Sequence, residues 1–111
     1  MIFEWDENKN NSNKSKHGIQ FETASFVFQD PCLLSIPDDC NSHYEERWRT
    51  LRLIQDIVVF IVHTIKVNEH GEEIIRIISA RAATPAETQR YNIYRRDGKR
   101  AECTDPLPRA L

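Results

Sequence analysis

Two patterns of apolar and polar positions divide the chain. Near the N-terminus, Phe3-Glu4-Trp5 alternates like a short strand, and Asp6 is a typical N-cap for a helix from Asn8 to His17 that Gly18 ends. That helix has no large apolar residue, so we expect it to be held through its ends or to lie flat on the surface. The helical spacing of Phe21, Ala24 and Phe28 predicts a second short helix, which ends at Asp30-Pro31.

A strand-like pattern follows in the middle of the chain. Leu33–Ile36 suits a brief strand, Glu46–Leu53 alternates, and Glu73–Arg81 forms a further strand. Between the last two, Ile57–Lys66 is a β-branched run that is too apolar for the edge of a sheet. The connections are short enough for tight hairpins only, so the last three strands are predicted to form an antiparallel meander.

The turn at Asn68-Glu69-His70-Gly71 decides which residues face each other across the second hairpin. A four-residue loop would place His63 opposite Arg76. A three-residue loop would place His63 opposite Ile77, on the face that carries Ser79 and Arg81, because a slip of one residue reverses every side chain.

The C-terminal part begins with a helix start signal. Thr84-Pro85-Ala86-Glu87 reads as a capping box, with a helix running to about Arg96 before Asp97-Gly98. We therefore predict an α+β fold with a small antiparallel sheet, two N-terminal helices and one C-terminal helix packed on it. Residues 1–98 form a single domain in this interpretation, and residues 99–111, which include Pro106 and Pro108, form a disordered and dispensable tail.

Composition and charge narrow the class of protein. The chain has 111 residues and a net charge of −2, which argues against a surface that binds nucleic acid everywhere. The charge is uneven, however: residues 1–46 hold three basic and nine acidic residues, and residues 47–111 hold twelve basic and eight acidic ones. A polyanion or an acidic partner surface would suit the second half. No apolar run approaches the length of a membrane span, and no signal peptide is recognised, so we expect no membrane association and a cytoplasmic location.

Several kinds of chemistry are improbable. The three glycines stand singly, so no phosphate-binding glycine loop exists, and no GxSxG nucleophile elbow occurs. Cys32, Cys40 and His43 lack the paired spacing of a zinc site, and an odd number of cysteines disfavours a disulfide framework. We expect neither a metal site nor a cofactor.

Cationic and imidazole side chains within apolar strands are the strongest chemical signal. His63 interrupts Ile57–Ile65, and Arg76 and Arg81 interrupt the next strand, where a charge is costly unless it is paired or faces water. Such placement suggests an anion site. The alternatives are a hydrogen-bonded core histidine and arginines in ion pairs with Glu46 or Glu87.

Two helix faces could also contact RNA. The C-terminal helix places Glu87, Arg90, Tyr91 and Tyr94 on one side, an aromatic and basic stripe that could stack and clamp RNA but is more often core packing. On the first helix, Lys9, Asn13, Lys16 and His17 share a face, for which a solvated surface is the commoner explanation.

The order and spacing of several motifs resemble the BrnT toxins of bacterial type II toxin–antitoxin systems. The resemblance runs from Phe3 to about Tyr91. It rests on Phe3-Glu4-Trp5-Asp6 with Lys9 and Asn13, Lys16-His17-Gly18-Ile19 with Phe21, Val27-Phe28 with Asp30-Pro31, Glu45-Glu46-Arg47-Trp48, Val62-His63-Thr64, Ile75-Arg76-Ile77-Ile78-Ser79-Ala80-Arg81 with Ala83-Thr84, and Glu87 with Tyr91.

The resemblance implies a fold like the RelE ribonucleases and a toxin that cleaves RNA and halts translation. It also implies a partner that resembles the antitoxin BrnA, whose ribbon-helix-helix part binds operator DNA as a complex with the toxin. Many relatives carry two arginines before the Ala-Thr pair, and Ala82 replaces the second one here.

Metal-independent RNA cleavage requires a base for the ribose 2′-hydroxyl, cations around the transition state and an acid for the leaving 5′-oxygen. We assign His63 as the candidate acid or base and Arg47, Arg76 and Arg81 as phosphate contacts, with Glu46 as the alternative base. Lys9, Lys16, His17, Arg90 and Tyr91 are the candidate RNA-binding residues. Two other interpretations stay open: a non-catalytic module that binds an antitoxin and assists repression, and an RNA-binding domain without a partner.

Overall fold

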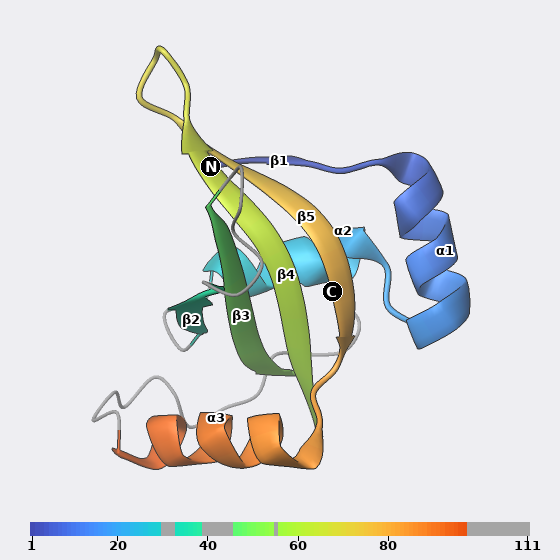
Figure 1. Ribbon diagram of the computed structural model, residues 1–111, viewed down its shortest axis with the longest axis vertical. Helices are drawn as coiled ribbons and strands as arrows, with labels where there is room; N and C mark the ends of the chain where they lie inside the picture. The colour runs from blue at the N-terminus through green and yellow to red at the C-terminus, as the bar shows by residue number, and fades with distance from the viewer. Residues whose placement is uncertain (30–32, 39–45, 55, 98–111) are drawn as a thin grey trace.

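A five-stranded sheet organises the chain, with helices against one of its faces and at one of its ends (Figure 1). The structure is a computed structural model that describes residues 1–29, 33–38, 46–54 and 56–97. In chain order the elements are β1 (Ile2–Glu4), α1 (Glu7–His17), α2 (Phe21–Ser25), the 3₁₀ turn η1 (Phe26–Gln29), β2 (Leu34–Pro37), β3 (Arg47–Ile54), β4 (Ile57–Val67), β5 (Glu73–Ala82) and α3 (Pro85–Asp97).

The sheet has the strand order β1-β5-β4-β3-β2 and is mixed. The predicted meander is confirmed, because β3, β4 and β5 pair antiparallel through short connections and β4 is central. The expectation of an antiparallel sheet is wrong at β1, which runs parallel to β5 with Ile2 opposite Ile74. The chain between β1 and β5 is long enough to allow either direction, so no local turn determines it.

The first helix has the predicted ends. Asp6 Oδ1 accepts hydrogen bonds from the backbone N–H of Asn8 at 2.8 Å and of Lys9 at 3.3 Å. Gly18 ends the helix with φ +74°, a left-handed conformation that favours glycine.

Two buried asparagines, not apolar side chains, attach α1 to the rest of the protein. Asn10 Oδ1 accepts from the backbone N–H of Phe21 at 2.8 Å. Asn13 Nδ2 donates to the carbonyls of Ala80 at 2.7 Å and Ile19 at 2.9 Å, and Asn13 Oδ1 accepts from Ala80 N–H at 3.2 Å. The Asn13 amide therefore satisfies the outer edge of β5 as a neighbouring strand would. The helix is therefore held along its side, so of the two expected alternatives, attachment through the ends and lying flat on the surface, the first is wrong.

The sheet carries a separate apolar cluster on each face. One cluster joins α2 and η1 to the sheet and contains Phe21, Ala24, Val27, Phe28, Ile54, Val59, Ile61, Ile75, Ile77 and Ala80. The other contains Leu51, Val58, Phe60 and, from α3, Tyr91. Figure 1 accordingly shows α2 crossing one face, α1 beside β5, and α3 at the end of the sheet where β5 finishes. No helix in the described ranges is long and apolar enough to cross a membrane.

The hairpin between β4 and β5 has the three-residue loop of the second alternative. Asn68 N–H donates to the Glu72 carbonyl at 2.9 Å, and Gly71 has φ +79° within the loop. His63 consequently lies opposite Ile77. One feature was not predicted: the register shifts between His63 and Val62, so that Val62 lies opposite Ser79 and Ile78 has no opposite residue. This β-bulge reverses the faces of β5 beyond it.

Candidate functional site

The sheet face opposite α2 carries four arginines, which we call the arginine face: Arg47, Arg49, Arg76 and Arg81. Residues directly opposite each other on neighbouring strands point to the same side of a sheet. Arg47 and Arg76 both lie opposite Thr64, which makes one row across β3, β4 and β5. Arg49 lies opposite Val62 in the next row, and Arg81 lies opposite Phe60 in the row after that.

Arg76 and Arg81 share this face only because of the bulge in β5. Five positions separate them, and a regular strand would place them on opposite faces. The extra residue at Ile78 restores Arg81 to the side of Arg76. The bulge also removes Arg81 from the face of His63, where the three-residue loop alone would have placed it.

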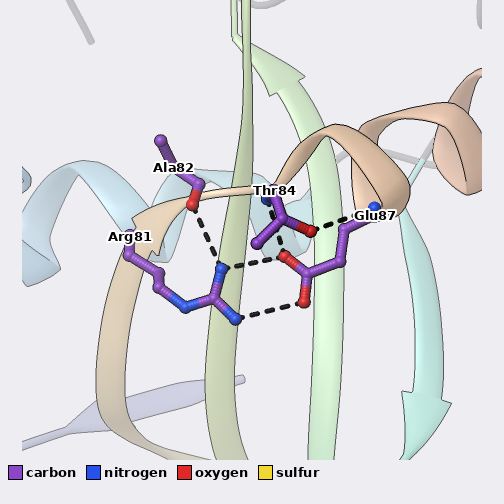
Figure 2. Close-up of polar contacts among 4 residues, drawn as sticks. All are labelled: Arg81, Ala82, Thr84 and Glu87. Carbon is purple, nitrogen blue, oxygen red and sulfur yellow. Dashed lines mark hydrogen bonds and ion pairs between the residues drawn. The ribbon is translucent and has the colours of Figure 1, made fainter.

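Arg81 is fixed by the start of α3. Its Nη1 and Nη2 donate to Glu87 Oε1 at 2.8 Å and Oε2 at 3.1 Å, a bidentate ion pair that Figure 2 shows. The guanidinium carbon lies 4.1 Å from the centre of the Phe60 ring. Of the ion pairs offered as an alternative for this arginine, with Glu46 or with Glu87, the one with Glu87 is observed.

The capping box places Glu87 for this contact. Thr84 Oγ1 accepts from Glu87 N–H at 3.2 Å, and Glu87 Oε1 accepts from Thr84 N–H at 2.8 Å. The hydrogen bond from Arg81 is the main cause that lowers the pKa of Glu87, and the same bond raises the pKa of Arg81. Both groups are charged at neutral pH.

Two other arginines of this face, Arg76 and Arg49, each lie near a carboxylate. Arg76 Nη1 is 3.8 Å from Glu4 Oε1, and both side chains are about half exposed. Arg49 Nε is 3.9 Å from Oδ1 of the buried Asp38. Arg49 also lines a hollow of about 40 Å³ together with Glu87 and the exposed Arg90 of α3. Arg90 thus lies at the rim of the arginine face.

His63 lies on the opposite face and is sealed. Its side chain is 0% exposed, Nε2 lies 2.6 Å from Thr50 Oγ1, and the ring meets Phe28 edge-on at 4.6 Å between centroids. Burial lowers the pKa of His63 to about 4. These contacts contradict its expected role at the reacting phosphate, since RNA cannot reach the ring. The alternative of a hydrogen-bonded core histidine fits them.

The structure also corrects the expected role of Tyr91 as an RNA-binding residue. The residue is 0% exposed and packs in the cluster of Leu51, Val58 and Phe60, so it offers no face for a nucleobase. Its hydroxyl accepts a hydrogen bond from Arg52 Nη1 at 3.2 Å. Core packing, the commoner explanation for such spacing, applies here.

The other predicted site residues are exposed on the surface. Lys9, Lys16 and His17 are exposed on α1, whereas Asn13 between them is buried. Glu46 is exposed immediately before β3, next to Arg47. Among the residues that the structure describes, no three histidine, cysteine or acidic side chains converge as metal ligands. Cys32, Cys40 and His43 lie outside those residues.

Sequence reasoning missed Arg49 as a member of the site and treated Glu87 only as an ion-pair partner. The alternation of β3 offered a signal for Arg49, because Arg47 and Arg49 stand two positions apart and must share a face. For Glu87 the capping box predicted the position of the carboxylate, but its distance to Arg81 depended on how α3 meets β5.

Comparison with known proteins agrees with the resemblance drawn from the motifs. A family model described as the ribonuclease toxin BrnT of type II toxin–antitoxin systems matches residues 5–87. No individual curated protein matches the chain. The matched range begins directly after β1 and ends in the first turn of α3, so it includes all four residues of the arginine face and Glu87.

Proposed function

Because the chain belongs to the BrnT family of ribonuclease toxins of type II toxin–antitoxin systems, we propose that the arginine face is where this toxin binds and cleaves RNA. The observation that carries the proposal is the bulge in β5, which brings Arg81 to the side of the sheet that already carries Arg47, Arg49 and Arg76. Four guanidinium groups on one face supply the positive charge that a phosphodiester and its more highly charged transition state require.

The chemistry follows from those cations and one base. Glu46 takes the proton of the ribose 2′-hydroxyl, the 2′-oxygen bonds to phosphorus, and the bond from phosphorus to the 5′-oxygen breaks. The 5′-oxygen leaves with a proton from water, so the products carry a 2′,3′-cyclic phosphate and a 5′-hydroxyl. Arg47, Arg76 and Arg81 contact the non-bridging oxygens. The exposure of Glu46 favours it over the buried His63 as the base.

Surfaces beside the arginine face extend RNA binding. Lys9, Lys16 and His17 on α1 and Arg90 on α3 lie at two sides of the sheet and would contact phosphates away from the cleaved bond. Such contacts contribute affinity without sequence preference. We place Tyr91 outside this set because it is buried.

The partner we propose is an antitoxin with a ribbon-helix-helix part, similar to BrnA, which binds operator DNA as a complex with the toxin. An acidic antitoxin surface would complement residues 47–111, where basic residues outnumber acidic ones twelve to eight. The role of a non-catalytic co-repressor is not favoured, since the family is one of ribonucleases. We further propose a RelE-like fold, a cytoplasmic location and a single toxin domain in residues 1–98.

The decisive experiment follows cleavage of a mixed-sequence RNA transcript by the purified toxin in EDTA. We expect cleavage to persist under chelation, and Arg81→Ala to slow it about 100-fold, the size typical of removing one donor to a transition-state oxyanion. Lys14→Ala on α1 is the matched control, because it removes the same charge from another part of the surface.

Two results would contradict the proposal. One is complete loss of cleavage in EDTA with recovery on addition of a divalent cation, which would require a metal-dependent mechanism. The other is wild-type cleavage by variants that replace Arg47, Arg76 and Arg81 with alanine, which would place the reaction elsewhere on the protein.

A further inference from the structure

We propose that Glu87 is a positioning residue of the ribonuclease site: its carboxylate holds the Arg81 guanidinium so that the edge formed by Nε and Nη2 is presented to an RNA phosphate. The inference rests on the proposed function, since it concerns how one of the proposed phosphate contacts is oriented.

A guanidinium group carries five N–H donors, and three of those on Arg81 have partners. Nη1 donates to Glu87 Oε1 at 2.8 Å and to the Ala82 carbonyl at 3.1 Å, while Nη2 donates to Glu87 Oε2 at 3.1 Å (Figure 2). Within the described part of the chain, no acceptor takes the second N–H of Nη2 or the N–H of Nε. These two donors lie side by side on one edge of the planar group. That edge matches two oxygens of a phosphate in a bidentate contact.

The guanidinium plane is fixed by contacts from three directions. Glu87 holds one edge, the Ala82 carbonyl holds the end of Nη1, and the Phe60 ring lies 4.1 Å from the guanidinium carbon. Arginine side chains lose much rotamer freedom when they bind a ligand, and an arginine that is already ordered avoids that loss. The Arg81 side chain is only 33% exposed. The edge formed by Nε and Nη2 therefore belongs to a guanidinium group that its neighbours hold in place.

The orientation depends on a carboxylate that is itself held. Glu87 Oε1 accepts from Thr84 N–H as well as from Arg81, so the side chain bridges the start of α3 and the end of β5. The pKa of Glu87 is lowered, chiefly by the hydrogen bond from Arg81, and a carboxylate with a low pKa is a weak proton acceptor. Its role is therefore to position Arg81, and the proton of the 2′-hydroxyl goes elsewhere.

The test compares Glu87→Gln with Arg81→Ala in steady-state cleavage of a mixed-sequence RNA transcript. Glutamine keeps the shape of glutamate, but its NH₂ group faces an N–H of Arg81 in place of an acceptor, so the bidentate pair is lost. We expect kcat to fall at least about 10-fold with KM changed less than about 3-fold, because a misaligned donor affects the transition state more than initial binding.

A double-mutant cycle separates positioning from an independent contribution. In the Arg81→Ala background, Glu87→Gln should cause no further loss of kcat, because Glu87 then has no guanidinium to orient. Equal fold-losses in the two backgrounds would overturn the proposal. Wild-type kcat for Glu87→Gln beside an impaired Arg81→Ala would overturn it as well. Wild-type kcat for Arg81→Ala would instead contradict the proposed function, so the two failures are distinguishable.

A control addresses the stability of α3. Ala86→Gly weakens the first turn of the helix but removes none of the hydrogen bonds that hold the Arg81–Glu87 pair, since Ala86 is exposed and its methyl side chain forms no hydrogen bond. We expect a lower thermal midpoint and a kcat within about 2-fold of wild type. If Ala86→Gly reduces kcat as much as Glu87→Gln does, the effect of Glu87 is one of helix stability and the proposal is wrong.

A binding measurement tests the presented edge without turnover. A 2′-O-methyl RNA has no free 2′-hydroxyl and is not cleaved, so it serves as the probe. In NMR spectra we expect the Nε–H signal of Arg81 to shift on addition of this RNA in the wild type, and to shift less in Glu87→Gln. An Arg81 signal that does not respond to the RNA in the wild-type protein would refute the presented edge.

Discussion

Arg76 and Arg81 lie on the same face of the sheet although five positions separate them along one strand. The bulge at Ile78 supplies the odd residue that brings them together, and Arg47 and Arg49 of β3 complete the set. A β-bulge near a site commonly re-aims a side chain in this way. In this protein it places on one face two arginines that a regular strand would direct to opposite faces of the sheet.

The first prediction concerns the salt dependence of RNA binding. Each phosphate contact on a single strand contributes about 0.7 to the slope of log K against log salt concentration. Arg76→Ala and Arg81→Ala should each reduce the magnitude of that slope by about this amount for a 2′-O-methyl RNA, measured by fluorescence anisotropy. Lys14→Ala should leave it unchanged, and equal slopes for all four proteins would exclude the arginine face as the binding surface.

The second prediction concerns the attachment of α1. Asn13→Ala removes hydrogen bonds to both backbone groups of Ala80 and to the Ile19 carbonyl in a buried place. We expect the free energy of unfolding to fall by about 3 kcal/mol, because unsatisfied buried backbone groups cost about 1–3 kcal/mol each but partly relax toward water. Urea titration measures the change.

The exposed Asn11 provides the matched control for this helix. Asn11→Ala should leave the free energy of unfolding within about 0.5 kcal/mol of wild type, as surface substitutions usually do. A similar effect of the two substitutions would mean that Asn13 contributes only through helix propensity.

The third prediction concerns pH and His63. Burial lowers the pKa of His63 from 6.5 to about 4, so between these values the unfolded chain binds a proton that the folded protein does not. The contribution of His63 to stability is therefore complete above about pH 6.5 and is lost as the pH falls toward 4. Its size is up to about 3 kcal/mol, since one pKa unit corresponds to about 1.4 kcal/mol.

This dependence can be separated from that of the carboxylates. His63→Gln removes the titrating group, and we expect its free energy of unfolding to fall less steeply than that of wild type between pH 6.5 and 4.5. Parallel curves for the two proteins would contradict the assigned pKa. Cleavage by His63→Gln at neutral pH should persist wherever the variant is folded, because the ring does not contact RNA.

The fourth prediction concerns Tyr91. Tyr91→Phe removes the hydroxyl that accepts from the buried Arg52, and should lower the free energy of unfolding by about 1–3 kcal/mol. Cleavage of RNA at a temperature where the variant is folded should stay within about 2-fold of wild type. A large loss of RNA affinity with unchanged stability would restore Tyr91 as an RNA-binding residue.

The sequence by itself determined the local elements and the family. The Asp6 N-cap, the Gly18 helix end, the capping box at Thr84 and the β-branched β4 depend on contacts between near neighbours, and all have the predicted form. The motifs from Phe3 to Tyr91 identified a ribonuclease toxin family, because their order and spacing survive in the linear chain without knowledge of the fold.

Only the tertiary structure decided which of the candidate residues meet. Sequence alternation assigns each strand its two faces, but a bulge such as that at Ile78 reverses the assignment, and its position depends on how β4 and β5 pack together. The parallel direction of β1 and the burial of Asn13 and His63 likewise depend on contacts between distant segments. The sequence does not distinguish a polar side chain that forms hydrogen bonds in the core from one that contacts RNA. The difference lies in the neighbouring residues, which only the fold brings together.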